Sequence, residues 1–291
     1  MKNDGGKSTS GRSNGANWQI PRGVTASNWE YAQANHISTG YDKFLSGDPL
    51  TTVDRQILNR YLPDLKFETE KKSNSNRPII ADFGCGNGRT LIPLLDRGYR
   101  GVGIDLSIPM LSAFQKKIGI EPNIAELSSD RRENGCFWIQ ANLVELQGIA
   151  DGAFDHGLSL FSTLGMIRGH ENRQLFLRHA RRTIKPGGWF ILHAHNVWYQ
   201  LRHPGGLRWA LGNSLRAMRG KSEFGDRESN YRGINKMFIH SFRRRELAKA
   251  LSLAGFHEFD WFGVSPHQEQ PVDGLPLGHP LRLVGWVVAC R

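Results

Sequence analysis

The stretch IIADFGCGNGR, residues 79–89, joins a short apolar run to three alternating glycines. The apolar run predicts a buried strand, and the glycines predict a tight turn from this strand into a helix. The first turn of such a helix offers unpaired backbone N–H groups, and glycines let a ligand approach them closely. The stretch therefore predicts a parallel α/β sheet with a ligand site at the end of its first strand.

After residue 79, short apolar runs alternate with helical patterns along most of the chain. The expected strands are residues 79–83, 101–106, 136–141, 154–161, 189–195, 237–242, 256–264 and 281–289. The expected helices in this region are residues 90–96, 108–118, 171–184 and 244–254, and residues 207–218 look helical and precede a polar loop that ends at about residue 235. Such alternation is typical of right-handed βαβ units. Before residue 79 we expect a short helix through residues 29–34, capped by Ser27 or Asn28, and a second helix over residues 50–62. We predict a Rossmann-like three-layer α/β sandwich, with a seven-stranded, mostly parallel sheet, an antiparallel last strand and an insertion after strand five.

The chain has 291 residues, of which 39% are hydrophobic, which is enough for one large α/β domain. Residues 1–25 are rich in Gly, Ser, Asn and Lys, so we predict a disordered tail followed by one domain over 26–291. We expect no membrane-spanning helix and no secretory signal, because the chain lacks a run of about 18 apolar residues and an apolar N-terminal region. The three cysteines are too few and too scattered for a disulfide framework or a zinc site, so we expect a cytoplasmic protein without a metal.

Basic residues outnumber acidic ones, with 38 Lys and Arg against 27 Asp and Glu and a formal net charge of +11. Residues 196–245 hold eleven of the cations and three of the anions, a net +8. A positive field favours anionic partners such as nucleic acid, phosphorylated small molecules or an acidic membrane surface. A solvated basic surface without a partner fits the same charge pattern.

The glycine stretch resembles the D/E-x-G-x-G-x-G motif of the class I S-adenosylmethionine-dependent methyltransferases, and of their small-molecule types 11 and 25 in particular. The acid two places before the first glycine suits a cationic ligand better than a pyrophosphate. Four further segments resemble motifs of the same family: GVGIDLS (101–107), IQANL (139–143), FDHGLSLF (154–161) and KPGG (185–188). The resemblance covers roughly residues 41–291 apart from the insertion, and it implies an enzyme with S-adenosylmethionine as cofactor.

The resemblance also implies a set of cofactor-binding residues. Asp105 would accept the ribose hydroxyls, Asn142 would meet the adenine amino group, and Tyr41 would close over the cofactor. Considered alone, Asp105 fits a helix N-cap and Asn142 a turn residue equally well. The implied cofactor set is Asp82, Gly84, Cys85, Gly86, Gly88, Asp105, Leu106, Asn142, Leu143, Phe161 and Tyr41.

The acceptor is harder to predict because the cofactor supplies the reactive methyl group, and a base is needed only if the nucleophile must lose a proton. His195, at the end of the fifth strand, and His240 are the candidate bases, with a structural role as the alternative for both. We predict that residues 196–235 form a basic, aromatic lid over the acceptor. The lid candidates are Trp198, Tyr199, Arg202 and Trp209.

Three functions compete. The first is a methyltransferase that acts on an aromatic or anionic small molecule. The second is an RNA methyltransferase that uses the basic insertion, and the third is a non-catalytic S-adenosylmethionine-binding module. The sequence argues against amino-N methylation of bases, because residues 160–165 (LFSTLG) lack the Pro-Pro-Tyr loop. It also argues against cysteine-dependent methylation of pyrimidines, which needs a cysteine near strands four or five, because Cys85, Cys136 and Cys290 lie elsewhere. It leaves the acceptor atom and the oligomeric state open.

Replacing Asp105 by Ala should weaken S-adenosylmethionine binding by about 1.5–3 kcal/mol, the loss expected for hydrogen bonds to a charged group. Isothermal titration calorimetry measures this difference directly. Unchanged affinity in the variant would contradict the ribose role.

Overall fold

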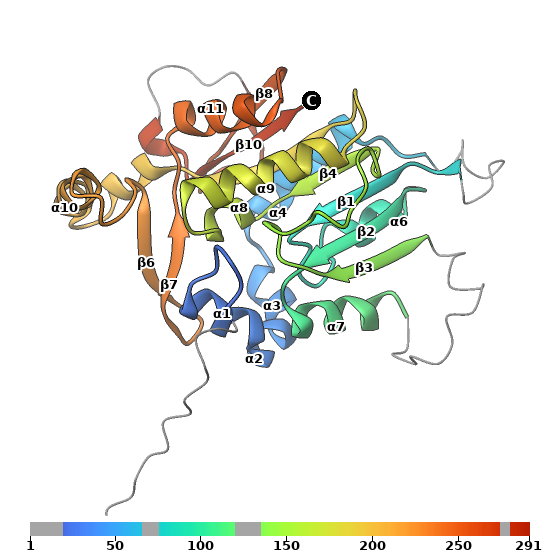
Figure 1. The fold of residues 1–291 in the computed structure, drawn as a ribbon, viewed down its shortest axis with the longest axis horizontal. Helices are drawn as coiled ribbons and strands as arrows, with labels where there is room; N and C mark the ends of the chain where they lie inside the picture. The colour runs from blue at the N-terminus through green and yellow to red at the C-terminus, as the bar shows by residue number, and fades with distance from the viewer. Residues whose placement is uncertain (1–19, 66–75, 120–134, 274–279) are drawn as a thin grey trace, which may run out of the picture.

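A computed structural model of the chain describes residues 20–65, 76–119, 135–273 and 280–291. Its centre is an eight-stranded sheet of order β3-β2-β1-β4-β5-β10-β8-β9 with helices on both faces (Figure 1). The strands are β1 (Ile79–Phe83), β2 (Arg100–Asp105), β3 (Cys136–Gln140), β4 (His156–Ser159), β5 (Phe190–His195), β8 (Phe259–Val264), β9 (Val272–Asp273) and β10 (Gly285–Cys290). The predicted three-layer α/β sandwich is confirmed, and the eighth strand is the two-residue edge strand β9.

Strands β1 to β5 are parallel to one another, and the last strand reverses direction. Strand β10 lies between β5 and β8 and is antiparallel to both, with Gly285 opposite His195 and Val264. The prediction of an antiparallel last strand is confirmed. Because β1 has β2 on one side and β4 on the other, the sheet order reverses at β1, where open α/β sheets bind their ligands.

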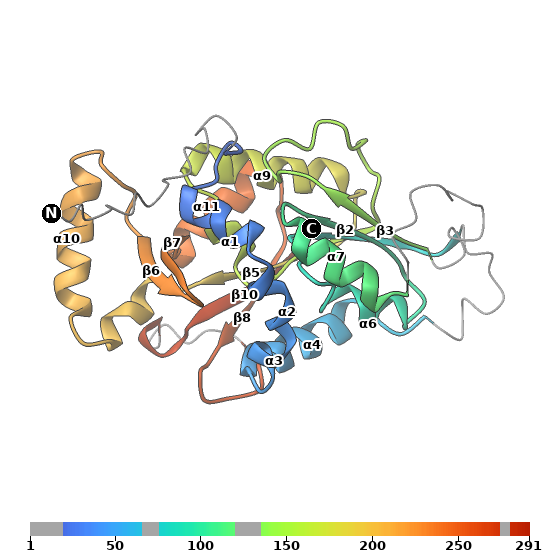
Figure 2. The ribbon, with the colours of Figure 1, turned by 90° about the horizontal axis from the view of Figure 1, so that it is seen from below.

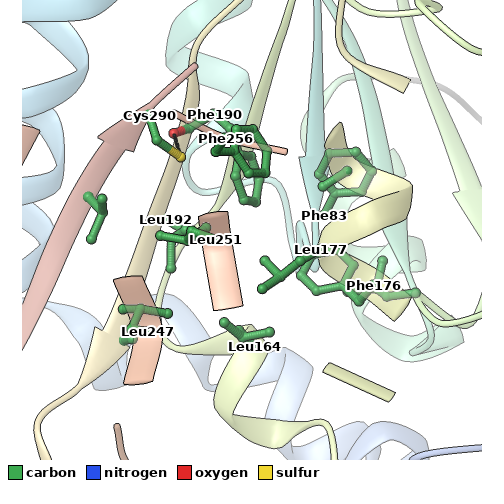
Figure 3. Close-up of a cluster of buried hydrophobic side chains, with 14 of the residues drawn as sticks. Phe83, Leu164, Phe176, Leu177, Phe190, Leu192, Leu247, Leu251, Phe256 and Cys290 are labelled. Carbon is green, nitrogen blue, oxygen red and sulfur yellow. Dashed lines mark hydrogen bonds between the residues drawn. The ribbon is translucent and has the colours of Figure 1, made fainter. Parts of the chain in front are cut away.

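Two apolar cores hold the helices against the sheet. On one face, α9 (His170–Thr183) and α11 (Arg244–Ala254) bury Phe176 and Leu247 against Phe83 and Phe190 (Figure 3). Each such side chain stabilises the fold by about 1.5–3 kcal/mol when fully buried. On the other face lie α4 (Pro49–Tyr61), α6 (Leu91–Leu95) and α7 (Ile108–Lys117). Their boundaries lie within one or two residues of those that the sequence predicts.

A separate two-stranded sheet follows α10 (Gly206–Met218), where the sequence predicts a polar loop. It consists of β6 (Asp226–Tyr231) and β7 (Ile234–His240), paired antiparallel. The loop prediction was wrong because β6 reads DRESNY and is only partly buried, so it shows no apolar alternation. The strand predicted over residues 237–242 is β7, and it pairs with β6 outside the main sheet.

The N-terminal helices lie beside this hairpin rather than against the middle of the sheet (Figure 2). They are α1 (Ala26–Gln33), α2 (Asn35–Thr39) and α3 (Tyr41–Leu45). Thr25 caps α1, two residues before the first predicted cap, Ser27, and its side chain accepts from the Asn28 backbone N–H. Residues 1–19 of the predicted tail lie outside the described residues, whereas residues 20–25 lead into α1 with a defined conformation.

Asn28 joins α1 to two other segments. Its buried side chain donates to the backbone oxygens of Met166 and Phe238, at 3.0 and 3.1 Å, and accepts from the Phe238 backbone N–H at 2.9 Å. At the other end of the hairpin, the Arg232 guanidinium donates to the Ile37 oxygen at 3.1 Å and lies 4.9 Å from the Phe44 ring centroid. The hairpin therefore fixes the N-terminal helices at both of its ends.

His240 ties the hairpin to α11. Its ring nitrogens lie 2.7 Å from an Asp226 carboxylate oxygen and 2.8 Å from a Glu246 carboxylate oxygen, and the ring is fully buried. Burial lowers the pKa of His240, but the hydrogen bonds to the two carboxylates outweigh it and raise the pKa overall. The same bonds lower the pKa of Asp226 and of Glu246 against the opposing effect of their burial.

Replacing His240 by Gln should destabilise the fold by about 2 kcal/mol or more, because it leaves two buried carboxylates without their cation. The protonated ring contributes its stability below its unfolded pKa of about 6.5, and the contribution is lost as the pH rises through the raised folded pKa. The contribution of the carboxylates is present above their unfolded pKa values and is lost as the pH falls through the lowered folded ones. The difference in unfolding free energy between the two proteins should therefore be largest between about pH 4.5 and 6.5. Urea titrations over a pH series measure it, and a difference that grows above pH 8 would contradict this account.

Candidate functional site

The loop after β1 is held by the end of β2. The Gly84 backbone N–H donates to the Ile104 oxygen at 2.7 Å, and the Gly86 N–H donates to one Asp105 carboxylate oxygen at 2.8 Å. The second oxygen of this carboxylate accepts from the Ser107 N–H at 2.8 Å. Asp105 thus orients the loop and the start of α7 while keeping further lone pairs on both oxygens.

The three glycines of the loop all have positive φ, at 86°, 55° and 78°, but they serve different ends. A Cβ on Gly84 would lie 2.4 Å from the Thr163 methyl carbon, and one on Gly88 would lie 2.2 Å from a ring carbon of Phe114. These two glycines permit close packing within the protein. A Cβ on Gly86 would meet nothing within 4 Å, so this backbone borders open space.

A cavity of about 150 Å³ opens at this loop, between the carboxyl ends of the strands and α1. Of the predicted cofactor residues, eight line it: Tyr41, Gly84, Gly86, Asp105, Leu106, Asn142, Leu143 and Phe161. Its other lining residues are Arg22, Gly23, Val24, Asn28, Tyr31, Ala32, Ser107, Met110, Thr163, Met166 and Ile167. The cavity thus joins segments from the first third of the chain with the ends of β1, β2 and β4.

Three predicted cofactor residues do not line the cavity. The Cys85 thiol is buried against Gly103, where an added Cβ would lie 2.8 Å from the sulfur, and Gly88 packs on Phe114. Asp82 is 2% exposed, so it lies behind the loop rather than on its open side. Burial raises the pKa of Asp82 to about 7, and the nearby charge of Arg89 opposes that rise.

Arg89 supports the loop from behind. Its guanidinium donates to the Asp54 carboxylate at 2.9 Å and lies 5.7 Å from the Phe161 ring centroid. Burial raises the pKa of Asp54 to about 6, against the effect of Arg89. A buried group of two carboxyls and one guanidinium therefore lies behind the loop, and its members are Asp54, Asp82 and Arg89.

Aromatic side chains form one wall of the cavity. The Tyr41 and Phe161 rings meet edge to face at 6.4 Å, and burial raises the pKa of Tyr41 and of Tyr31, so both hydroxyls stay neutral. Phe161 and Ser162 have φ of 56° and 63°, a conformation that costs non-glycine residues about 1–2 kcal/mol each. Strained backbone of this kind concentrates at functional sites, and here it places Phe161 in the cavity wall.

Sequence reasoning missed Tyr31 and the segment from Arg22 to Val24. The cavity wall includes both, yet both precede the first recognisable motif, and the tail prediction extended to residue 25. The Asn142 side chain donates to the Arg22 backbone oxygen at 3.0 Å, which holds this segment beside the cavity. Asn142 also accepts from the Val144 N–H at 3.3 Å, so it is a turn residue and a cavity residue together.

The two candidate bases lie in different surroundings. His240 has both ring nitrogens bonded to carboxylates and is fully buried, so it offers no free nitrogen to an acceptor. His195 is the last residue of β5, and its backbone N–H donates to the Ser162 hydroxyl at 3.4 Å, next to the cavity wall. Burial, assisted by the charge of Arg227, lowers the pKa of His195 to about 4, so its ring is neutral at pH 7.

The predicted lid residues pack among themselves instead of against the cavity. Trp198 and Trp209 lie 5.9 and 6.3 Å from the Phe224 ring centroid, and Arg243 lies 4.5 Å from the same ring. Tyr199 meets His203 edge to face at 5.3 Å. Together with Arg202, they belong to the segment of η4 (Val197–Arg202) and α10, which lies at the outer end of the hairpin (Figure 1).

Over the described ranges, no group of three or more His, Cys, Asp or Glu side chains is arranged to hold a metal ion. Within the same ranges, no helix combines the length and the apolar character needed to cross a membrane.

The geometry agrees with comparisons to known proteins. Residues 81–192 match the family model described as a methyltransferase domain. The matched segment runs from β1 to β5 and includes the glycine loop and Asp105. YqeM of Bacillus subtilis (strain 168), which is named as a methyltransferase, is 29% identical over 117 residues, and the match covers 40% of this chain and 42% of YqeM.

Solved methyltransferases share the fold at low sequence identity. The CcbJ methyltransferase from Streptomyces caelestis is 17% identical with a TM-score of 0.56, covering 89% of this chain and 98% of its own. The 1,6-didemethyltoxoflavin-N1-methyltransferase of Burkholderia thailandensis is 16% identical with a TM-score of 0.52, covering 94% of this chain and 92% of its own. These likenesses confirm the Rossmann-like fold.

The cavity fits S-adenosylmethionine, the cofactor that the family resemblance implies. Gly86 leaves open space where a side chain would stand, so a ligand can approach the loop backbone. The Asp105 carboxylate faces the same cavity and can accept two hydroxyl protons. The aromatic wall provides apolar surface for a base or a sulfonium group.

Replacing Gly86 by Ala should weaken S-adenosylhomocysteine binding at least tenfold, because the new methyl group enters the ligand space. Gly187→Ala is a matched control, since Gly187 also has a positive φ (81°) and nothing within 4 Å of an added Cβ, yet lies outside the cavity lining. Both variants should lose about 1 kcal/mol of stability through backbone strain. Calorimetry and thermal unfolding separate the two effects, and equal affinities in the two variants would contradict the role of Gly86.

Proposed function

We propose that this protein transfers the methyl group of S-adenosylmethionine to a small-molecule acceptor that carries an anionic group. The observation that carries the proposal is a cofactor-type cavity that is covered by α1 and walled by aromatic rings. The hairpin adds a guanidinium, that of Arg227, whose buried Nε atom has no hydrogen-bond partner. A covered cavity suits a small acceptor better than a polynucleotide, which needs an open groove.

The chain's own residues would bind and align the reactants. Asp105 would accept the ribose hydroxyls, and Asn142 and Leu143 would border the adenine ring. The positive charge of the cofactor would favour the ionised form of Asp82, whose pKa of about 7 leaves it partly protonated even with Arg89 nearby. When bound, the cofactor supplies a methyl group on a sulfonium, and in-line alignment without water is the protein's main task.

Arg227 is the candidate anion-binding residue. It lies on β6, its Nε atom is buried without a hydrogen-bond partner, and the described residues supply no carboxylate within ion-pair distance. Burial lowers the pKa of Arg227, which is the expected effect on a cation that has lost water and gained no partner. An acceptor carboxylate or phosphate would satisfy this guanidinium, because arginine binds such groups through two parallel hydrogen bonds.

His195 is the second residue that we assign to the acceptor site. The charge of Arg227 helps to lower its pKa, so the two groups are close enough to interact, and the His195 ring lies 5.2 Å from that of His193. Neither ring nitrogen of His193 has a hydrogen-bond partner. We infer that neutral His195 contacts the acceptor and orients it. With a pKa of about 4, it accepts a proton only from a strongly acidic group.

Small-molecule chemistry on the same fold supports this proposal. The Burkholderia thailandensis structure contains 1,6-didemethyltoxoflavin together with S-adenosylhomocysteine. A glycopeptide N-methyltransferase, MtfA, shares the fold at 16% identity and a TM-score of 0.52.

Transfer of a tritiated methyl group from S-adenosylmethionine into a fractionated cell extract tests the proposal. We expect the label in the small-molecule fraction, with retention on an anion-exchange resin. Label in RNA would establish the RNA alternative, and tight cofactor binding without label in any fraction would establish the non-catalytic alternative. Arg227→Gln should reduce labelling at least tenfold while leaving the S-adenosylhomocysteine affinity unchanged, whereas Arg244→Gln, an exposed neighbour at the start of α11, should change neither.

A further inference from the structure

Helix α10 carries an exposed apolar stripe. The side chains of Leu207, Leu211, Leu215 and Met218 are 68%, 67%, 47% and 84% exposed. Their spacing of four, four and three residues places them on one side of the helix. Figures 1 and 2 agree that α10 lies at the end of the molecule opposite β3 and α6, where its outer side faces away from the sheet.

The opposite side of α10 is fixed to the protein. Asn213 is buried and donates to the Asp226 backbone oxygen at 2.9 Å while it accepts from the Gly225 N–H at 2.8 Å. A Cβ on Gly206 would lie 2.1 Å from the Gln200 oxygen, so the helix begins in close contact with η4. The apolar stripe is therefore not the side by which α10 packs on its own domain.

Cations border the stripe. Arg208, Arg216, Arg219 and Lys221 are exposed, and residues 206–222 contain no acidic side chain. With about 100° per residue, Arg208 and Arg219 fall beside the stripe, whereas Arg216 lies about 100° beyond the edge of the stripe, toward the side that packs on the protein. Among the described residues, none of these four cations makes a salt bridge within 4.0 Å.

We propose that α10 docks this protein on an anionic membrane surface. The helix would lie in the plane of the interface, with the stripe of Leu207, Leu211, Leu215 and Met218 entering the acyl boundary and the neighbouring arginines meeting lipid phosphates. Leucines on one side and arginines beside them, without intervening acids, are the composition of interfacial helices. The inference stands independently of the acceptor chemistry.

Charge complementarity favours a membrane over other occupants of this face. In a symmetric pair of α10 helices, the four cations of one copy would face the same four of the other, and like charges across an interface cost free energy. RNA would pair with the arginines but would leave the leucines in water. An anionic bilayer satisfies both features of the helix together.

Flotation of the full chain with vesicles measures the docking. We expect binding to phosphatidylcholine vesicles that contain about a third phosphatidylglycerol, and little binding to phosphatidylcholine alone. Arg216→Gln with Arg219→Gln should reduce the partition coefficient at least tenfold, since each cation near an anionic surface contributes about 1 kcal/mol. Leu211→Gln with Leu215→Gln should reduce it at least as much, because glutamine keeps the helix but removes the apolar surface.

Leu253→Gln is the matched control, because Leu253 is 56% exposed on α11, away from the stripe, and its replacement should leave the partition unchanged. Unchanged S-adenosylhomocysteine affinity shows that each variant is folded. Absence of wild-type binding to the anionic vesicles would overturn the proposal. Full vesicle binding by the leucine variant would also overturn it. A third contradicting result would be a wild-type protein that sediments as a dimer, a leucine variant that sediments as a monomer, and no vesicle binding by either.

Discussion

The hydrogen bond from the Gly86 backbone to the Asp105 carboxylate joins the ends of the two strands on which the site depends. Without it, a loop of three glycines with positive φ would have many accessible conformations, each losing entropy on ligand binding. Asp105 also fixes the start of α7 through Ser107. One carboxylate thus positions the loop, begins a helix and keeps lone pairs that face the cavity.

The buried charges behind the loop explain why the motif begins with an acid that the cavity does not expose. Asp82, Asp54 and Arg89 form a group in which one guanidinium serves two carboxyls, so one negative charge is only partly compensated. The positive charge of a cofactor in front of the loop would compensate the remaining negative charge of this group. We infer that Asp82 acts on the cofactor through the local field, while its backbone carries the strand into the glycines.

The sheet and the glycine loop could be predicted because short apolar runs, glycine spacing and helix signals are local in sequence. Seven of the eight residues implied by the family resemblance that line the cavity do so for the same reason, since they lie at the ends of β1, β2, β3 and β4, whereas Tyr41 comes from α3. Strand β6 could not be predicted, because a partly buried hairpin strand lacks apolar alternation. Some positions depend on partners roughly 120 to 210 residues away or on burial alone, which no local pattern encodes. These are the positions of Tyr31, of the segment from Arg22 to Val24 and of Arg227. Trp198 and Trp209 were assigned to a lid on composition, and composition does not say which way a helix faces.

The contact between Asn28 and Phe238 has a consequence for biosynthesis. The helix that covers the cavity is made early, but its partner strand leaves the ribosome some 210 residues later. During that interval the nascent chain holds α1 without the surface that secures it. The cavity is therefore completed only after the hairpin has been translated, and a chain truncated before the hairpin would leave the glycine loop uncovered.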